Sequence, residues 1–148
     1  EREYKTEETL PPFAEKYLSS DFRCTLVFAD RKDGNRFPGI EAVKDADVLF
    51  VSVRRRTLPP EDLALIRKHV AEGKPVIGIR TASHAFSLRG KPAPKGYASW
   101  ENWDAEVMGG NYTGHHGNKI KTKVSSQEGA GAFLAGGKPA TVSTGGAL

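Results

Sequence analysis

Basic side chains follow two apolar segments of the chain, at the point where each segment ends. A run of three arginines (54–56) comes directly after residues 48–53, and Arg80 and His84 follow residues 76–79. Both apolar segments are short and β-branched, which is typical of strands buried on both faces of a parallel sheet. The carboxyl ends of parallel strands meet at one edge, where ligands collect. Because guanidinium groups bind carboxylates, phosphates and hydroxyls, this edge predicts a site for an anionic or polyhydroxylated ligand. The alternative is an ordinary loop whose polar residues are solvated.

A second polar group, Asn111, Tyr112 and His115, lies in a glycine-rich segment further along the chain. His115 and His116 are adjacent, and adjacent histidines supply too few ligands for a metal ion. No spacing of Cys, His and Asp elsewhere completes such a site, so we expect neither a metal nor another cofactor. A solvent-exposed histidine pair in a loop is the alternative to a functional role.

The residues available do not favour a nucleophilic mechanism. Ser83 is next to His84, but the sequence around it has neither an identified acid partner nor a Gly-x-Ser-x-Gly context. The single cysteine, Cys24, begins the apolar segment 24–28 and is predicted to be a buried thiol of the core. One cysteine also excludes an internal disulfide bond.

The composition suits a globular domain and excludes several kinds of partner. Of 148 residues, 38% are hydrophobic and 27% are charged, and this length is enough for one domain with a substantial core. No apolar run approaches the roughly 20 residues that span a bilayer, so no membrane partner is expected. The net charge of +4 is modest, and no basic patch interleaved with aromatic residues accompanies it, which disfavours nucleic acid.

Helices and strands are predicted to alternate in the first half of the chain. Apolar positions repeat every three or four residues over 10–18, which predicts a helix with Pro11 and Pro12 in its first turn. A short helix over 41–45 and a longer one over 61–72 follow. This alternation is typical of a doubly wound, mostly parallel α/β sheet. Its strands are predicted at residues 24–29, 48–53 and 76–79.

The second half of the chain carries weaker patterns. Proline and glycine predict a loop over 91–96, and a helix is predicted over 99–109. Trp100 and Trp103 on that helix are expected to pack in or around the core. Residues 119–125 alternate lysine with other residues, which predicts a half-exposed strand with a solvated lysine face.

The turn after residues 76–79 resembles the nucleophile elbow of class I glutamine amidotransferase-like folds. Gly-Ile-Arg-Thr-Ala stands where those folds carry Gly-x-Cys-x-Gly, and GGNYTGH is similar to the Gly-Gly-x-Phe-x-x-His stretch of their trehalose-utilisation (ThuA-like) branch. That branch lacks the cysteine and commonly has His in its place, whereas this sequence has Arg80. The resemblance covers most of the chain, in the segments EREYKTEETLPPFAEKYL, DADVLFVSVRRRTLPPEDLALIRKHVAEGKPVIGIRTASHAF and WDAEVMGGNYTGHHGNK.

This resemblance to the ThuA-like family implies a flavodoxin-like fold, also called class I glutamine amidotransferase-like. In that family a strand usually precedes a segment like EREYKTEETLP and lies inside the sheet. The chain is therefore expected to be a single ThuA-like domain, residues 1–148, truncated at both ends. A complete, smaller α/β protein is the alternative. The acidic residues at the start would then follow the absent strand at the ligand-binding edge, with surface charge as the alternative role.

Two functions remain open. The resemblance implies a carbohydrate-related domain that binds a sugar or an anionic sugar derivative, with or without transforming it, and that hydrolyses neither glutamine nor peptides. His84 and His115 would transfer protons in such a site. The ligand would be bound by Arg54, Arg56, Arg80, Asn111 and Tyr112. The other function is a non-catalytic α/β module for protein assembly, homo-oligomers included. Loss of the nucleophile favours the module, and the polar groups gathered at one edge favour the sugar site.

Overall fold

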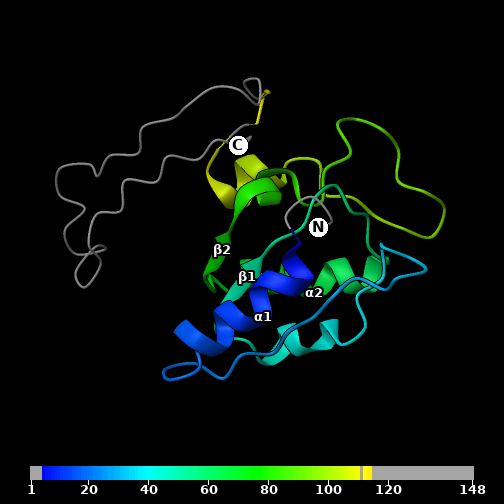
Figure 1. Ribbon diagram of the computed structural model, residues 1–148. Coiled ribbons are helices and arrows are strands. Elements are labelled where there is room, and N and C mark those ends of the chain that lie inside the picture. The colour runs from blue at the N-terminus through cyan, green and yellow to red at the C-terminus, as the bar shows by residue number, and fades with distance from the viewer. Residues whose placement is uncertain (1–4, 111, 115–148) are drawn as a thin grey trace. The chain divides into compact units, whose positions relative to one another are not determined.

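The computed structural model describes residues 5–110 and 112–114 (Figure 1). The chain divides into two compact units, Glu1–Tyr112 and Thr113–Leu148, and the described helices and strands belong to the first. In chain order they are α1 (Thr6–Tyr17), the 3₁₀-helix η2 (Ile40–Asp45), β1 (Leu49–Val51), α2 (Pro60–Ala71), β2 (Val76–Gly78), the 3₁₀-helix η3 (Arg80–His84) and the π-helix η4 (Asp104–Met108). The architecture is mixed α/β, which agrees with the predicted α/β class.

A parallel pair of strands forms the sheet, in the order β1-β2 (Figure 1). Phe50 lies opposite Ile77 in the register of this pair. The backbone N–H of Leu49 donates to the carbonyl of Pro75 at 3.0 Å, and that of Ile79 donates to Val51 at 3.1 Å, which extends the ladder at both ends. The two apolar segments therefore pair in parallel as predicted, although each strand is only three residues long.

Helix α2 connects the two strands and forms as the sequence predicts. Pro60 occupies its first position, where a missing N–H is harmless, and Gly73 follows its end with a φ of 73°. Leu63 and Ile66 are buried on the inner face of the helix, where they belong to the core. His69 is also buried, and its Nε2 lies 3.1 Å from the carbonyl oxygen of Pro75, which ties the helix to the start of β2.

Residues 24–29 form no strand, so that prediction is wrong. Among the described residues, no backbone hydrogen bond joins this segment to β1 or β2. Cys24, Leu26 and Phe28 are exposed, and only Val27 packs against the core, so the predicted burial of the Cys24 thiol is also wrong. The physical reason is that β-propensity depends on context: an apolar run becomes a strand only where a neighbouring strand takes its hydrogen bonds.

Helix α1 begins earlier than predicted, and its two prolines lie inside it rather than in its first turn. The carbonyl of Lys5 accepts the backbone N–H groups of Glu8 and Thr9 at 2.9 and 3.0 Å, so the first turn closes before the prolines are reached. Acidic residues in that turn face the positive end of the helix. Phe13 and Tyr17 remain exposed on this helix.

The segment that follows β2 supplies the rest of the core. Trp103 is fully buried and its indole N–H donates to the carbonyl of Ala82 at 2.6 Å. Trp100 is also buried and meets Trp103 edge-to-face with ring centroids 5.2 Å apart, so the predicted core role of both is confirmed. The predicted helix over 99–109 is reduced to the π-helix η4, which ends at Gly109 with a φ of 70°. The predicted strand over 119–125 lies outside the described residues.

No helix in the described ranges has both the length and the apolar character needed to cross a membrane.

Candidate functional site

A cavity of about 420 Å³ lies beyond the carboxyl end of β2. Its walls come from η3, the loop after it, and the segment that carries η4. Every lining residue except Ala105 carries a polar, charged or aromatic side chain. The lining residues are His84, Ser87, Arg89, Glu101, Asn102, Asp104, Ala105 and Tyr112.

His84 is the last residue of η3 and is held in a neutral state. Its side chain is buried, its Nδ1 lies 3.1 Å from the Oγ of Ser83, and its ring centroid lies 4.5 Å from that of Tyr112. Burial, together with the positive charges of Arg55, Arg54 and Arg89, lowers the pKa of His84 to about 4. The imidazole therefore carries no charge near neutral pH, and it can accept or donate one hydrogen bond through each ring nitrogen according to its tautomer.

The arginine turn after β1 is bonded directly to the segment that carries His84. The backbone N–H of Arg55 donates to the carbonyl of His84 at 3.1 Å, and that of Arg56 donates to Ala85 at 2.7 Å. Arg55 has a φ of 49°, a left-handed conformation that non-glycine residues rarely adopt. Burial lowers the pKa of Arg55, and the charges of Arg89 and Arg54 act in the same direction, whereas Tyr112 opposes them.

Arg89 reaches the same cavity from a separate loop. Its guanidinium carbon lies 5.1 Å from the ring centroid of Tyr112. The loop that carries Arg89 is shaped by Glu101, whose carboxylate accepts hydrogen bonds from the hydroxyl of Ser87 and from the N–H groups of Leu88 and Gly90, at 3.0 to 3.1 Å. Burial alone would raise the pKa of Glu101, but these hydrogen bonds bring it below its usual value.

Asp104 holds the other wall of the cavity. One carboxylate oxygen accepts the backbone N–H of Tyr112 at 2.8 Å, and the other accepts that of Ala105 at 3.0 Å. Both carboxylates that line the cavity, Glu101 and Asp104, are thus engaged with backbone amides. These contacts place Arg89 and Tyr112 at the cavity.

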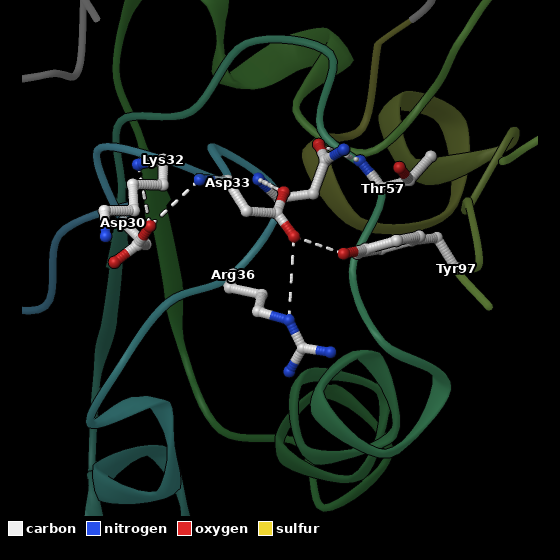
Figure 2. Close-up of polar contacts among 7 residues, drawn as sticks. Asp30, Lys32, Asp33, Arg36, Thr57 and Tyr97 are labelled. Carbon is white, nitrogen blue, oxygen red and sulfur yellow. Dashed lines mark hydrogen bonds and ion pairs between the residues drawn. The ribbon is translucent and has the colours of Figure 1, made fainter. Parts of the chain in front are cut away.

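A second polar cluster contacts Thr57, the residue directly after the arginine run, and Figure 2 shows this cluster. The carboxylate of Asp33 accepts the hydroxyl of Tyr97 and lies 3.6 Å from the Nε of Arg36. The side-chain oxygen of Asn35 accepts the N–H of Thr57 at 3.3 Å, directly after the arginine run. The hydrogen bond from Tyr97 lowers the pKa of Asp33 and raises that of Tyr97 itself. This cluster positions the turn and does not line the cavity.

The structure brings together some of the residues predicted for the site. His84 and Tyr112 both line the cavity, and Arg54 lies close enough to lower the pKa of His84. Arg56 extends toward the second polar cluster. Its guanidinium lies against Gly34, so closely that a Cβ added at this glycine would be 2.8 Å from Nη1 of Arg56.

Arg80 is exposed at the start of η3 with a φ of 53°, and it is not among the residues that line the cavity. Asn111 and His115 lie outside the described residues.

The charged residues of the cavity, Arg89, Glu101 and Asp104, were not predicted from the sequence, and neither was Arg55, which acts on the pKa of His84. Arg55 belongs to the arginine run, but which member of a run turns inward depends on the backbone conformation, which spacing does not reveal. Arg89 precedes Gly90 in a short turn, and both residues have positive φ. The glycine in the sequence indicates a turn there, but nothing local indicates that Arg89 reaches a cavity. The two carboxylates accept hydrogen bonds from residues 8 to 14 positions away in sequence, for which the sequence shows no pattern.

No group of three or more His, Cys, Asp or Glu side chains that could hold a metal ion occurs within residues 5–110 and 112–114. No family model, no curated protein and no solved structure matches this chain.

Proposed function

We propose that this chain is a ThuA-like domain with a doubly wound, flavodoxin-like fold, and that the cavity beside His84 binds a sugar or keto-sugar. The proposal rests on the sequence resemblance and agrees with the parallel β1-β2 pair joined by α2. It also agrees with the position of the cavity, which lies beyond the carboxyl end of a parallel strand, where α/β folds place ligands.

The observation that carries the proposal is the mixture of side chains around one aromatic ring. Arg89 and Asn102 supply donors, Glu101 and Asp104 retain lone pairs beyond those their backbone contacts use, and Tyr112 offers a ring face. Sugar hydroxyls both donate and accept, while the C–H faces of a sugar pack on aromatic rings, so this mixture matches them. The volume of about 420 Å³ lies within the roughly 300–1,000 Å³ of small-molecule sites.

His84 would act on such a ligand as a neutral group. An imidazole whose pKa is about 4 is uncharged near pH 7, so it stabilises an oxyanion on a keto-sugar by donating a hydrogen bond. The guanidinium of Arg89 would add charge stabilisation from the side of Tyr112. None of the lining residues is an activated nucleophile, so the proposal includes no covalent intermediate.

The test is ligand-observed NMR and titration calorimetry on the whole chain with a panel of mono- and disaccharides and their keto derivatives. We expect weak but saturable binding by some members of the panel. Substitution Tyr112→Ala should abolish it, because the ring forms one wall of the cavity. Tyr17→Ala removes an exposed aromatic ring from α1 and serves as the matched control. A panel without any binder, or equal binding by the Tyr112 variant, would overturn the proposal.

One observation favours the second candidate, a non-catalytic interaction module. Phe50 and Ile77 lie opposite each other in the sheet, and both side chains are exposed, 38% and 50% respectively. Exposed apolar groups on a sheet are common at protein–protein contacts. If the sugar panel gives no binder, and sedimentation analysis shows self-association that Phe50→Lys abolishes, this candidate replaces the sugar site.

A further inference from the structure

We propose that Ser83 is a positioning residue of this site: its hydroxyl donates to Nδ1 of His84, which leaves the proton of the imidazole on Nε2, facing the cavity. The ligand then meets a hydrogen-bond donor at His84 and places an acceptor oxygen against it. This inference rests on the proposed sugar site and deepens it, because it assigns the polarity of the group that His84 presents.

The first argument is that His84 is held at three points other than Nε2. Its backbone carbonyl accepts the N–H of Arg55 at 3.1 Å. Its ring packs against the ring of Tyr112, with 4.5 Å between the centroids. Its Nδ1 lies 3.1 Å from the Oγ of Ser83. A rotation of the ring that exchanged the two nitrogens would break the contact with Ser83, so this contact decides which nitrogen is left for the cavity.

The second argument is that Nε2 is available to a ligand. The side chain of His84 is buried in the fold, yet it lines the cavity. Among the described residues, no side chain or backbone group forms a hydrogen bond with its Nε2. The buried side-chain atoms that lack a partner in that part of the chain are Ser52 Oγ, Arg55 Nε and His69 Nδ1, and Nε2 of His84 is not one of them. We infer that the cavity reaches this nitrogen, which can bond there to a ligand or to water.

The third argument concerns the direction of the bond between Ser83 and His84. A neutral imidazole has one N–H and one bare nitrogen, and the partner of one nitrogen fixes the state of the other. The bond to Nδ1 is the one hydrogen bond of the Ser83 hydroxyl within residues 5–110 and 112–114. The lining of the cavity carries two carboxylates, Glu101 and Asp104, against one arginine, Arg89. This balance of charge favours an N–H over a bare lone pair at the nitrogen that faces the interior.

The protonation state of His84 makes the choice of tautomer matter. Burial and the charges of Arg55, Arg54 and Arg89 lower its pKa to about 4, so the ring is neutral near pH 7 and carries a single proton. Only a neutral imidazole can present either a donor or an acceptor, since both nitrogens of the charged ring are donors. The contact with Ser83 is therefore the device that selects between two chemically different sites.

Nuclear magnetic resonance tests the tautomer without any ligand. Long-range proton–nitrogen correlation spectra of the whole chain, with isotope-labelled histidine, distinguish a protonated ring nitrogen from a bare one. Loss of signals in His84→Gln assigns those of His84. At about pH 7 we expect one tautomer, with the proton on Nε2 and Nδ1 bare. A proton on Nδ1, or an even mixture of both forms, would overturn the inference.

Variants of Ser83 show whether its hydroxyl is responsible. Ser83→Ala should produce a mixture of tautomers and raise the pKa of His84, because a hydrogen bond to the lone pair stabilises the neutral ring. Ser83→Thr keeps a hydroxyl and should restore the single tautomer, which a merely structural loss would not explain. Ser87→Ala removes a hydroxyl of the lining that bonds to Glu101, and should leave the tautomer unchanged. Circular dichroism confirms that each variant folds. Identical spectra for Ser83→Ala and the parent chain would refute the role of Ser83.

Glucose and fructose separate this inference from the proposed function. A sugar that binds should shift the Nε2 signal of the parent chain and bind about five- to ten-fold more weakly to Ser83→Ala, which corresponds to about one hydrogen bond. Equally tight binding to both proteins overturns the inference and leaves the sugar site standing. If no sugar of the panel binds, while the spectra show a proton on Nε2 that depends on Ser83, the positioning role is supported and the proposed function is overturned.

Discussion

The backbone N–H of Arg55 lies 3.1 Å from the carbonyl oxygen of His84, to which it donates a hydrogen bond. This bond joins the turn after β1 to the turn after β2, and a second bond from Arg56 to Ala85 doubles the connection. The two turns are far apart in sequence, yet they form one unit at the end of the sheet. The charge of the arginine turn therefore acts on His84 at close range, which is consistent with the lowered pKa of the imidazole.

The lowered pKa of His84 predicts how the free energy of unfolding depends on pH. Its pKa is about 4 in the folded protein, against 6.5 for an ordinary histidine of an unfolded chain, so the unfolded state binds more protons between these values. The stabilisation is fully present above pH 6.5 and is lost as the pH falls toward 4. We expect the melting temperature to drop by several degrees from about pH 7 to about pH 5, as measured by circular dichroism. In His84→Gln this drop should be clearly smaller. An identical pH dependence in both proteins would contradict the assigned state of His84.

Arg80 predicts a difference between two small substitutions. Its φ of 53° lies in the left-handed region, which glycine adopts without strain and alanine does not. Arg80→Gly and Arg80→Ala remove the same side-chain contacts, so their difference isolates the backbone. We expect the glycine variant to be more stable than the alanine variant by about 1 kcal/mol in urea denaturation. Equal stability of the two would show that residue 80 is not left-handed in solution.

The uneven burial of apolar residues predicts which of them matter for stability. Leu63 on α2 is 2% exposed, whereas Ile77 in the middle of β2 is 50% exposed. Leu63→Ala should cost about 2–5 kcal/mol because it leaves a cavity in the core. Ile77→Ala should cost about 1 kcal/mol or less, because water already reaches that side chain. Urea denaturation of both variants checks this, and a larger loss for Ile77 would mean that its face is covered in solution.

The elbow-like turn predicts the absence of one activity. If the proposed resemblance to amidotransferase-like folds holds, Arg80 stands where those folds carry a nucleophilic cysteine. The single cysteine of the chain, Cys24, does not line the cavity. A guanidinium cannot attack a carbonyl carbon. We expect no release of ammonia from glutamine by the pure protein, measured by a coupled assay, and none in Cys24→Ser. Glutamine hydrolysis that disappears on Arg80→Ala would contradict this prediction.

The exposure of Cys24 also predicts that a thiol reagent modifies it in the folded protein.

The local patterns of the sequence determined the elements whose stability depends on near neighbours. The three-to-four-residue spacing of Leu63, Ile66 and Val70, with Pro60 before it and Gly73 after it, was sufficient to predict α2. Apolar β-branched runs were sufficient to predict both strands of the sheet, and parallel pairing followed from the helix between them. His84 was predicted at the edge of the sheet for the same reason: it follows a strand directly.

The tertiary structure decided whatever depends on a partner far along the chain. Residues 24–29 have the composition of a strand, but a strand exists only where another one takes its hydrogen bonds, and the described part of the structure supplies none there. The amide of Arg55 bonds to His84 and its φ is positive, and no spacing in the arginine run encodes either fact. Arg89 is likewise brought to the cavity by Glu101, through contacts between loops. Local periodicity specifies which face of an element is buried, whereas long-range hydrogen bonds specify which side chains meet.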